Sequence, residues 1–390
     1  MKLYPKLIVS FIVLTVIFVA ITLLLGNESP AIISSILLLL YGGLLVAAAG
    51  FLIIKPISTL SQKAVELGNG NPNTDLYQSE TDEIGTIGKQ LKLISDRLHK
   101  EIKEENQLSD QLVKQKNELE EQKNKLEKVN SEITSSINYA QRIQNSQLPT
   151  PGELRRNVND SFIFFQPKDV VSGDFYWFEK VRRGRNEYLI IACADCTGHG
   201  VPGAIMSMMG GNQLTNIIYY QNYIEPVKIL TRLDKAIKFE LYRDEQSSLK
   251  QDGMEIMVCV IDLDTLEMNF AGAGLPLMIW DQKELKVIKS PKLMVGGIDG
   301  EDEKEVEDQF EENKIQLKEG DRLYMSSDGI QDQFGGADDK RFMAKRLRDL
   351  LQSTTDIKMR DQGKKVEDVF RKWKGDQDQT DDVLVIGIEL

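Results

Sequence analysis

Two long apolar runs near the start of the chain constrain its fold more than any other feature. Residues 7–25 are almost wholly apolar and uncharged, and residues 32–54 form a second run of the same kind. Each run is long enough to cross a hydrocarbon core of about 30 Å as a helix. A cleaved signal peptide is the alternative for the first run, but no small-residue cleavage site follows it and the second run comes at once. We therefore expect residues 1–54 to form two transmembrane helices with a short outer loop.

Lysines on the outer flanks of these runs predict the topology. Lys2 and Lys6 flank the first run, and Lys55 and Lys63 follow the second. Positively charged flanks remain on the cytoplasmic side, so both termini and everything after residue 54 are expected in the cytoplasm. The chain would then be a multi-pass protein of the cytoplasmic membrane, in direct contact with membrane lipid.

The segment after the second run, residues 55–98, resembles a HAMP module, the four-helix signal converter of bacterial membrane receptors. The resemblance rests on Pro56, directly after the apolar run, and on the run Asp82-Glu83-Ile84-Gly85 that opens a helix. It implies that the membrane is the inner membrane of a bacterial cell. A plain membrane-proximal helical hairpin is the alternative.

A heptad repeat begins at Ile84 and predicts a coiled-coil signalling helix over residues 99–148. Most members of the a position are apolar, among them Leu91, Leu98, Leu112, Leu119, Leu126 and Ile133. The d position is interrupted by polar residues at 101, 115, 122 and 136. An apolar seam with polar interruptions indicates a parallel coiled coil of modest stability, and therefore a homodimer. A single amphipathic helix packed on its own domain is the alternative.

Charge and cysteine content exclude some classes of function. The chain has 60 acidic and 48 basic residues and a net charge of −12, so we expect no nucleic-acid partner, which would require a basic face. Its 3 cysteines, Cys193, Cys196 and Cys259, do not make a disulfide scaffold. Cys193 and Cys196 have the C-x-x-C spacing, but they close an apolar strand and lack a second pair. We expect small strand residues there and not a redox or zinc site.

The sequence changes character after Pro149 and Pro151, which end the long helix. From residue 162 onward, short apolar runs of strand length alternate with turns, and helical patterns lie at about residues 202–220, 226–241 and 340–351. Many strands with a few helices between them predict an α+β fold with the helices outside the sheets. Residues 149–390 are expected to form this domain.

Four short acidic motifs carry the chemistry. They are Gly173-Asp174, Asp195 in ADCTGHG, Ser327-Asp328-Gly329 and Asp381-Asp382. Each lies at the end of an apolar run or in a turn that contains glycine, so the carboxylates can point from separate strands to one place. Aspartates that converge repel one another unless a cation lies between them, and hard oxygen ligands select Mg²⁺ or Mn²⁺ over zinc. The motifs therefore predict a two-metal hydrolase.

Five segments follow one another in an order that is typical of one protein family. They are SINYAQRIQNSQLP, KDVVSGDFYW, ADCTGHGVPGA, LKEGDRLYMSSDGIQDQ and QTDDVLVIGI. With them the chain from about residue 136 to residue 390 resembles the metal-dependent protein phosphatases of the PPM (PP2C-like) superfamily, and more narrowly its SpoIIE/RsbU branch. The resemblance implies an α-β-β-α sandwich of two antiparallel sheets flanked by helices, with the metals at one rim.

The same resemblance implies a set of ligands for two Mn²⁺ or Mg²⁺ ions. The set consists of Asp174, Asp195, the backbone carbonyl of Cys196, Asp328 and Asp381, with Asp195 bridging both ions. Asp382 would orient these ligands without binding directly, beside Gly173. His199 could protonate the leaving serine oxygen. It lies one residue later than the histidine of the eukaryotic motif DGHG, so loop packing or a contact with substrate is the alternative.

These features predict a membrane-anchored, metal-dependent protein serine/threonine phosphatase of bacterial signal transduction. It would hydrolyse phosphoserine or phosphothreonine on a regulatory protein by means of a metal-activated water. The resemblance implies a STAS-type anti-sigma-factor antagonist, or a similar protein, as that partner. The alternative is a catalytically inactive, membrane-tethered scaffold that binds the same kind of partner. The retained acidic set argues against a scaffold.

Overall fold

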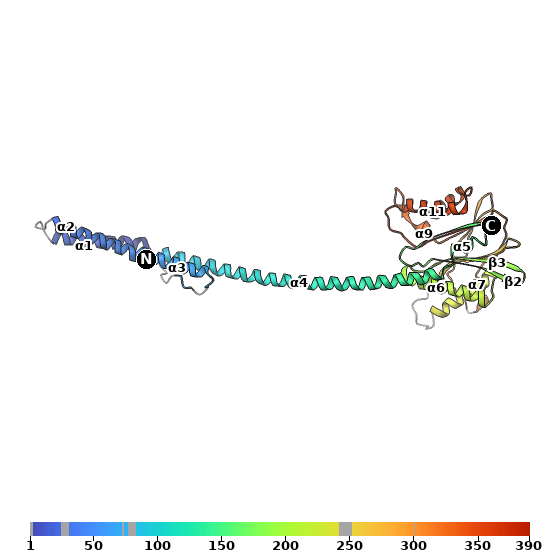
Figure 1. The fold of residues 1–390 in the computed structure, drawn as a ribbon, viewed down its shortest axis with the longest axis horizontal. Coiled ribbons are helices and arrows are strands. Elements are labelled where there is room, and N and C mark those ends of the chain that lie inside the picture. Colours follow the sequence, from blue (N-terminus) through green and yellow to red (C-terminus); the bar gives the residue numbers. More distant parts are fainter. Residues whose placement is uncertain (1–2, 25–30, 72–73, 77–82, 242–251, 301) are drawn as a thin grey trace. The chain divides into compact units, whose positions relative to one another are not determined.

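The chain divides into two compact units, Met1–Glu127 and Lys128–Leu390, each with its own apolar cluster. The structure is a computed structural model, drawn in Figure 1. It describes residues 1–390 apart from 1–2, 25–30, 72–73, 77–82, 242–251 and 301.

The first unit begins with the predicted apolar helices. α1 covers Leu3–Leu24 and α2 covers Ala31–Ala49, which continues through the π-helical turn η1 (Gly50–Ile54) into α3 (Lys55–Gly68). Thr15 Oγ1 lies 2.6 Å from the hydroxyl of Tyr41, which joins α1 to α2. Among the described residues, one helix, Leu38–Gly68, is long and apolar enough to cross a membrane, and Ile8–Leu24 is a shorter apolar helix. Length and composition alone do not place either helix in a membrane, so both predicted spans stay predictions.

The helix α4 extends without interruption over Glu83–Gln147, a length of 65 residues. At its start Ile84 packs with Leu60, Leu67 and Leu76 in a small buried cluster. Further along, the apolar heptad residues face solvent in the single chain, with Leu119 70% and Leu126 71% exposed. A long helix with an uncovered apolar seam agrees with the predicted coiled coil, although the partner helix and the HAMP-like module stay predictions.

The second unit contains two five-stranded antiparallel sheets. The first sheet has the order β1-β12-β9-β6-β7, formed by Asp160–Gln166, Val383–Glu389, Arg322–Ser326, Leu277–Trp280 and Leu285–Ile288. The second has the order β2-β3-β4-β5-β8, formed by Phe175–Arg183, Asn186–Cys196, Met254–Asp262, Glu267–Ala273 and Asn313–Gln316. Short elements connect them: α5 (Pro151–Leu154), α8 (Glu303–Glu307), α9 (Gly329–Asp332), β10 (Phe334–Gly335) and β11 (Lys340–Arg341). The predicted α+β class is confirmed.

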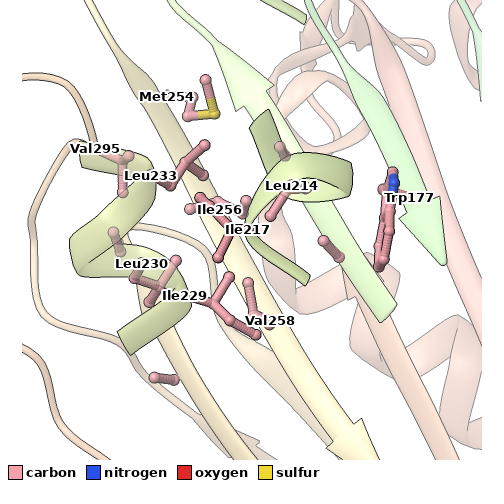
Figure 2. Packing of buried hydrophobic residues seen from close by; sticks show 14 of the residues in the cluster. Trp177, Leu214, Ile217, Ile229, Leu230, Leu233, Met254, Ile256, Val258 and Val295 are labelled. Atoms are coloured by element: carbon pink, nitrogen blue, oxygen red, sulfur yellow. The ribbon is translucent and has the colours of Figure 1, made fainter. Parts of the chain in front are cut away.

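Helices cover the outer face of each sheet (Figure 1). The sheet that contains β3 packs against α6 (Gly200–Thr215), the π-turn η2 (Asn216–Tyr220) and α7 (Pro226–Leu241). Figure 2 shows this layer, with Leu214, Ile217 and Leu233 directed at Ile256 and Val258 of β4. The sheet that contains β9 packs against α10 (Met343–Ser353) and α11 (Met359–Lys374). The layers are therefore α-β-β-α, as predicted.

The strand β3 is continuously apolar because both of its faces are buried. Leu189, Ile191 and Cys193 belong to the core between the sheets, whereas Ile190 and Ala192 face the helices. A strand that is buried on both faces reads as an unbroken apolar run instead of an alternating one. Cys196 falls in the helix-side core and is free, as is Cys193, so the two thiols lie on opposite faces of the sheet. The prediction of small strand residues is confirmed.

A candidate metal centre at one rim of the sandwich

Asp174 and Asp195 lie at the same end of one sheet. Asp174 directly precedes β2, and Asp195 is the second-last residue of β3. The antiparallel register pairs Phe175 with Ala194, which brings the two aspartates to neighbouring positions. Strand pairing therefore unites two motifs that are 21 positions apart in the sequence.

The other two acidic motifs lie at one end of the other sheet. Asp328 follows the end of β9 by two residues, while Asp381 and Asp382 directly precede β12. The two strands are antiparallel neighbours, with Val385 paired to Ser326. The end of one strand therefore meets the start of the other.

Ser327 connects these two rims. Its hydroxyl donates to Oδ2 of Asp174 at 2.5 Å and accepts from the backbone N–H of Leu384 at 3.0 Å. Ser327 is 0% exposed and Asp174 2%. A buried serine of one sheet thus fixes the carboxylate of the other sheet, and the acidic site is built across the sandwich.

Asp382 holds the loop that leads to Asp174. Its two carboxylate oxygens accept hydrogen bonds from the backbone N–H groups of Lys168 and Gly173, each at 2.7 Å. The loop passes very close to Gly198, since a Cβ at Gly173 would lie 2.7 Å from the Gly198 carbonyl oxygen. Glycine at position 173 is therefore a condition for this approach.

Burial and mutual repulsion raise the pKa of the first two aspartates. The pKa of Asp195 is raised to about 7, first by burial and then by the charges of Asp328 and Asp381. Burial raises the pKa of Asp174 well above its usual range, and Asp195 adds to this shift while the hydrogen bond from Ser327 opposes it. The pKa of Asp195 is thus raised by charges from both sheets, since Glu255 of its own sheet also contributes.

The carboxyl groups on the second sheet are perturbed in the same direction. Burial, then Asp332 and Asp381, raise the pKa of Asp328. Burial also raises the pKa of Asp382, against the hydrogen bonds from Lys168 and Gly173 that favour its charge. Carboxylates that oppose one another's ionisation in this way favour the binding of a cation between them.

Glu255 is a further carboxylate of this rim, and the sequence patterns did not predict it. It is the register partner of Asp195 across β3 and β4. Burial, followed by the charge of Asp328, raises its pKa. The side chain lies against Gly274, where a Cβ would come within 2.4 Å of the Glu255 carboxyl carbon. Its signal in the sequence is no more than a position at the start of an apolar strand.

His199 lies in the exposed loop that follows β3. Its Nδ1 is 3.0 Å from Oδ2 of Asp169, and the two side chains are 53% and 48% exposed. Since Asp169 engages Nδ1, the opposite ring nitrogen, Nε2, is the one that could meet a substrate. The sequence pattern singled out His199 but not Asp169.

The donors present at the rim suit a hard divalent cation. They are carboxylate oxygens, joined by the Cys196 carbonyl oxygen, which would lie 3.3 Å from a Cβ at Gly173. Among the residues that the structure describes, no three His, Cys, Asp or Glu side chains are gathered closely enough to hold a metal ion by themselves. A metal at this rim would therefore need backbone oxygen and water as well as the carboxylates.

Two antiparallel sheets flanked by helices are the architecture of a PP2C-type phosphatase domain. Among solved structures, the chain is similar to the SiaA-PP2C domain of Pseudomonas aeruginosa, with 26% identity and a TM-score of 0.58 over 67% of this chain and 98% of that one. It is also similar to the PP2C phosphatase domain with a regulatory fragment of SpoIIE from Bacillus subtilis, with 19% identity and a TM-score of 0.46 over 59% of this chain and 63% of that one. A third similar structure is that of the RsbU and RsbW domains of Rv1364c from Mycobacterium tuberculosis, with 17% identity and a TM-score of 0.44 over 59% of this chain and 59% of that one.

The chain belongs to the SpoIIE family. The family described as Stage II sporulation protein E (SpoIIE) matches residues 185–390, which is more than half of the chain. Comparison with curated proteins gives no match. The family match contains Asp195, Asp328 and Asp381 but begins after Asp174, whose place at the rim comes from the strand pairing and from the hydrogen bond that Ser327 donates.

Proposed function

We propose that this protein is a metal-dependent protein serine/threonine phosphatase anchored in a bacterial inner membrane. The observation that carries the proposal is the rim where Ser327 of one sheet donates to Asp174 of the other, beside Asp195. A divalent cation would relieve the repulsion between these buried carboxylates. The reaction is hydrolysis of a phosphoserine or phosphothreonine monoester to inorganic phosphate and the free hydroxyl.

The proposed ligands of two Mn²⁺ or Mg²⁺ ions are Asp174, Asp195, the Cys196 carbonyl, Asp328 and Asp381. When bound, the ions supply positive charge for the phosphate and an activated water. Asp195 would be the ligand shared by both ions, because the charges of Asp328 and Asp381 raise its pKa and its own charge raises the pKa of Asp174. Asp382, whose oxygens accept from Lys168 and Gly173, orients the loop and does not bind.

His199 is the proposed general acid for the leaving serine or threonine oxygen. The contact with Asp169 orients its ring, which leaves Nε2 to donate the proton. The pair lies on the loop between β3 and α6, directly after Asp195 and Cys196.

Two further features support a place in signal transduction. The helix Leu38–Gly68 supports a membrane anchor, and the exposed apolar seam of α4 supports a homodimer. The substrate would be a phosphorylated regulatory protein. A STAS-type anti-sigma-factor antagonist is the expectation for the SpoIIE/RsbU branch.

Hydrolysis of p-nitrophenyl phosphate by the full chain in detergent, with and without Mn²⁺, tests the proposal. We expect Mn²⁺-dependent activity that falls by about 100-fold in Asp195→Asn and Asp328→Asn, because each change removes a charged ligand. Asp264→Asn is the matched control, since Asp264 follows the opposite end of β4 from Glu255. A wild-type protein that binds a partner but never hydrolyses the ester would favour the inactive scaffold.

A further inference from the structure

The last turns of α4 lie against the phosphatase unit through one face. Ile137, Ala140, Gln141 and Gln144 are the less exposed residues of this stretch, whereas Ile143 and Gln147 are exposed. Their spacing of three, four and seven residues is that of one side of a helix. Leu148, directly after α4, packs against both the core between the sheets and the helix-side core. This end of α4 is therefore part of the phosphatase unit.

Gln144 is the polar residue at the centre of this contact, and it is 3% exposed. Its amide nitrogen donates to the carbonyl oxygen of Ser172 at 2.6 Å and to the hydroxyl of Ser207 at 2.8 Å. Its amide oxygen accepts from the backbone N–H of Ser172 at 3.1 Å. One side chain thus satisfies both backbone groups of Ser172, as a neighbouring strand would.

Ser172 is two residues from the proposed ligand Asp174. Its hydroxyl accepts from the backbone N–H of Asp174 at 3.1 Å, and the residue is 0% exposed. The intervening Gly173 donates to Asp382. The loop is therefore held from two sides, by Asp382 at the start of β12 and by Gln144 at the end of α4.

We infer that Gln144 is a positioning residue, which holds the loop from Ser172 to Asp174 in the form that binds metal. The inference rests on the proposed function of the rim. Without the glutamine amide, the N–H of Ser172 would lack a partner in a place that water does not reach, and its C=O would keep only the Ser207 hydroxyl, which lies at 3.2 Å. The loop would rearrange to satisfy the N–H. Metal affinity then depends on whether the last turns of α4 stay seated. The last turns of α4 and the proposed metal site are linked through this side chain.

Calorimetric titration of the metal-free full chain with Mn²⁺, in detergent, tests this inference without relying on turnover. Gln144→Met keeps the length of the side chain and removes its hydrogen bonds, and we expect it to raise the Mn²⁺ dissociation constant at least about 10-fold. Ser207→Ala removes one of the three hydrogen bonds of Gln144 and a second donor to the Ser172 carbonyl, but leaves both hydrogen bonds between Gln144 and Ser172. It should have a smaller effect, about 3-fold. Gln147→Met, on the exposed side of the same helix, is the matched control and should bind as the wild type does.

Comparing the Mn²⁺ concentration needed for half-maximal activity with kcat at saturating Mn²⁺ distinguishes a positioning role from a role in stability alone. We expect Gln144→Met to need more Mn²⁺ for half-maximal hydrolysis of p-nitrophenyl phosphate, with kcat at saturating Mn²⁺ within about 3-fold of wild type. Wild-type Mn²⁺ affinity in a Gln144→Met protein that merely melts at a lower temperature would overturn the inference. Mn²⁺ binding by the wild type without hydrolysis would instead overturn the proposed function, while the affinities of the variants still judge the role of Gln144. A wild type that binds no Mn²⁺ would overturn both.

Discussion

At the scale of single residues, Asp195 makes the stability of the metal-free protein depend on pH. Its pKa is raised to about 7 in the fold, and the pKa of Asp174 and Asp328 is raised as well, so the folded state holds more protons than the unfolded chain. The contribution of these groups to the free energy of unfolding is then fully present below about pH 4 and is lost as the pH rises through about 7. In chelator, we expect the melting temperature to fall between pH 5 and pH 8 by on the order of 5 °C.

Thermal unfolding of the full chain in EDTA checks this expectation. Asp195→Asn should flatten the pH profile and raise the melting temperature at pH 8, because it removes one of the repelling charges. Added Mn²⁺ should do the same for the wild type. A melting temperature that increases from pH 5 to pH 8 without metal would contradict the electrostatics of the rim.

His199 is tested by the chemistry of the leaving group. The alkoxide of serine must be protonated as it leaves, whereas p-nitrophenolate is stable without a proton. His199→Asn should therefore slow hydrolysis of a phosphoserine peptide by about 100-fold and that of p-nitrophenyl phosphate by less than about 3-fold. Asp169→Asn, which removes the carboxylate charge beside the ring nitrogen Nδ1, should act in the same direction more weakly. Equal losses on both substrates would assign His199 to loop packing.

The aspartates of the rim could be located from the sequence, whereas their partners could not. Asp174 and Asp328 lie in short motifs at the ends of apolar runs, and such positions can be recognised in the sequence. Glu255 joins them because β4 pairs with β3, and Gln144 because a helix end reaches a loop 28 positions away. Register and tertiary packing decide these contacts, and no local pattern encodes them.

At the scale of elements, the layers of the sandwich followed from apolar runs, but one helix did not. α11 is highly charged and has Gly363 in its second turn, which lowers its intrinsic helix propensity. The reason lies in the packing, since a Cβ at position 363 would come within 2.6 Å of Phe162 on β1. Glycine is kept for close contact with the sheet, and that contact is invisible until the strand is placed.

The seam of α4 gives a prediction at the same scale. Leu112 and Leu119 occupy the a position and are 57% and 70% exposed in the single chain, so a parallel partner helix would bring each next to its own copy. Single cysteines at these positions should form disulfide-linked dimers in membranes. Asn117→Cys, on the outer side of the helix, is the control and should cross-link poorly. The native Cys193, Cys196 and Cys259 are buried and give little background. Equal cross-linking at all three positions would rule out the seam.

At the scale of the whole molecule, α4 is an unbroken helix of 65 residues, so its helical phase can be changed by insertion. Seven residues inserted after Asn117 preserve the heptad phase, and we expect cysteine cross-linking at Leu112 and Leu119 and Mn²⁺-dependent hydrolysis within about 3-fold of wild type. Two inserted residues turn the following segment by about 200°, so the seam on the two sides of the insertion no longer faces the same way.

The two-residue insertion should therefore keep the cross-link on one side of position 117 and lose it on the other. Loss of helix pairing should also loosen the last turns of α4, and with them the hydrogen bonds of Gln144 to Ser172. Hydrolysis at limiting Mn²⁺ should then fall by at least about 5-fold, with recovery at saturating Mn²⁺, because the defect lies in metal affinity. If both insertions left hydrolysis and cross-linking alike, α4 would be a passive tether, and control of the phosphatase site would have to come from another surface of the domain.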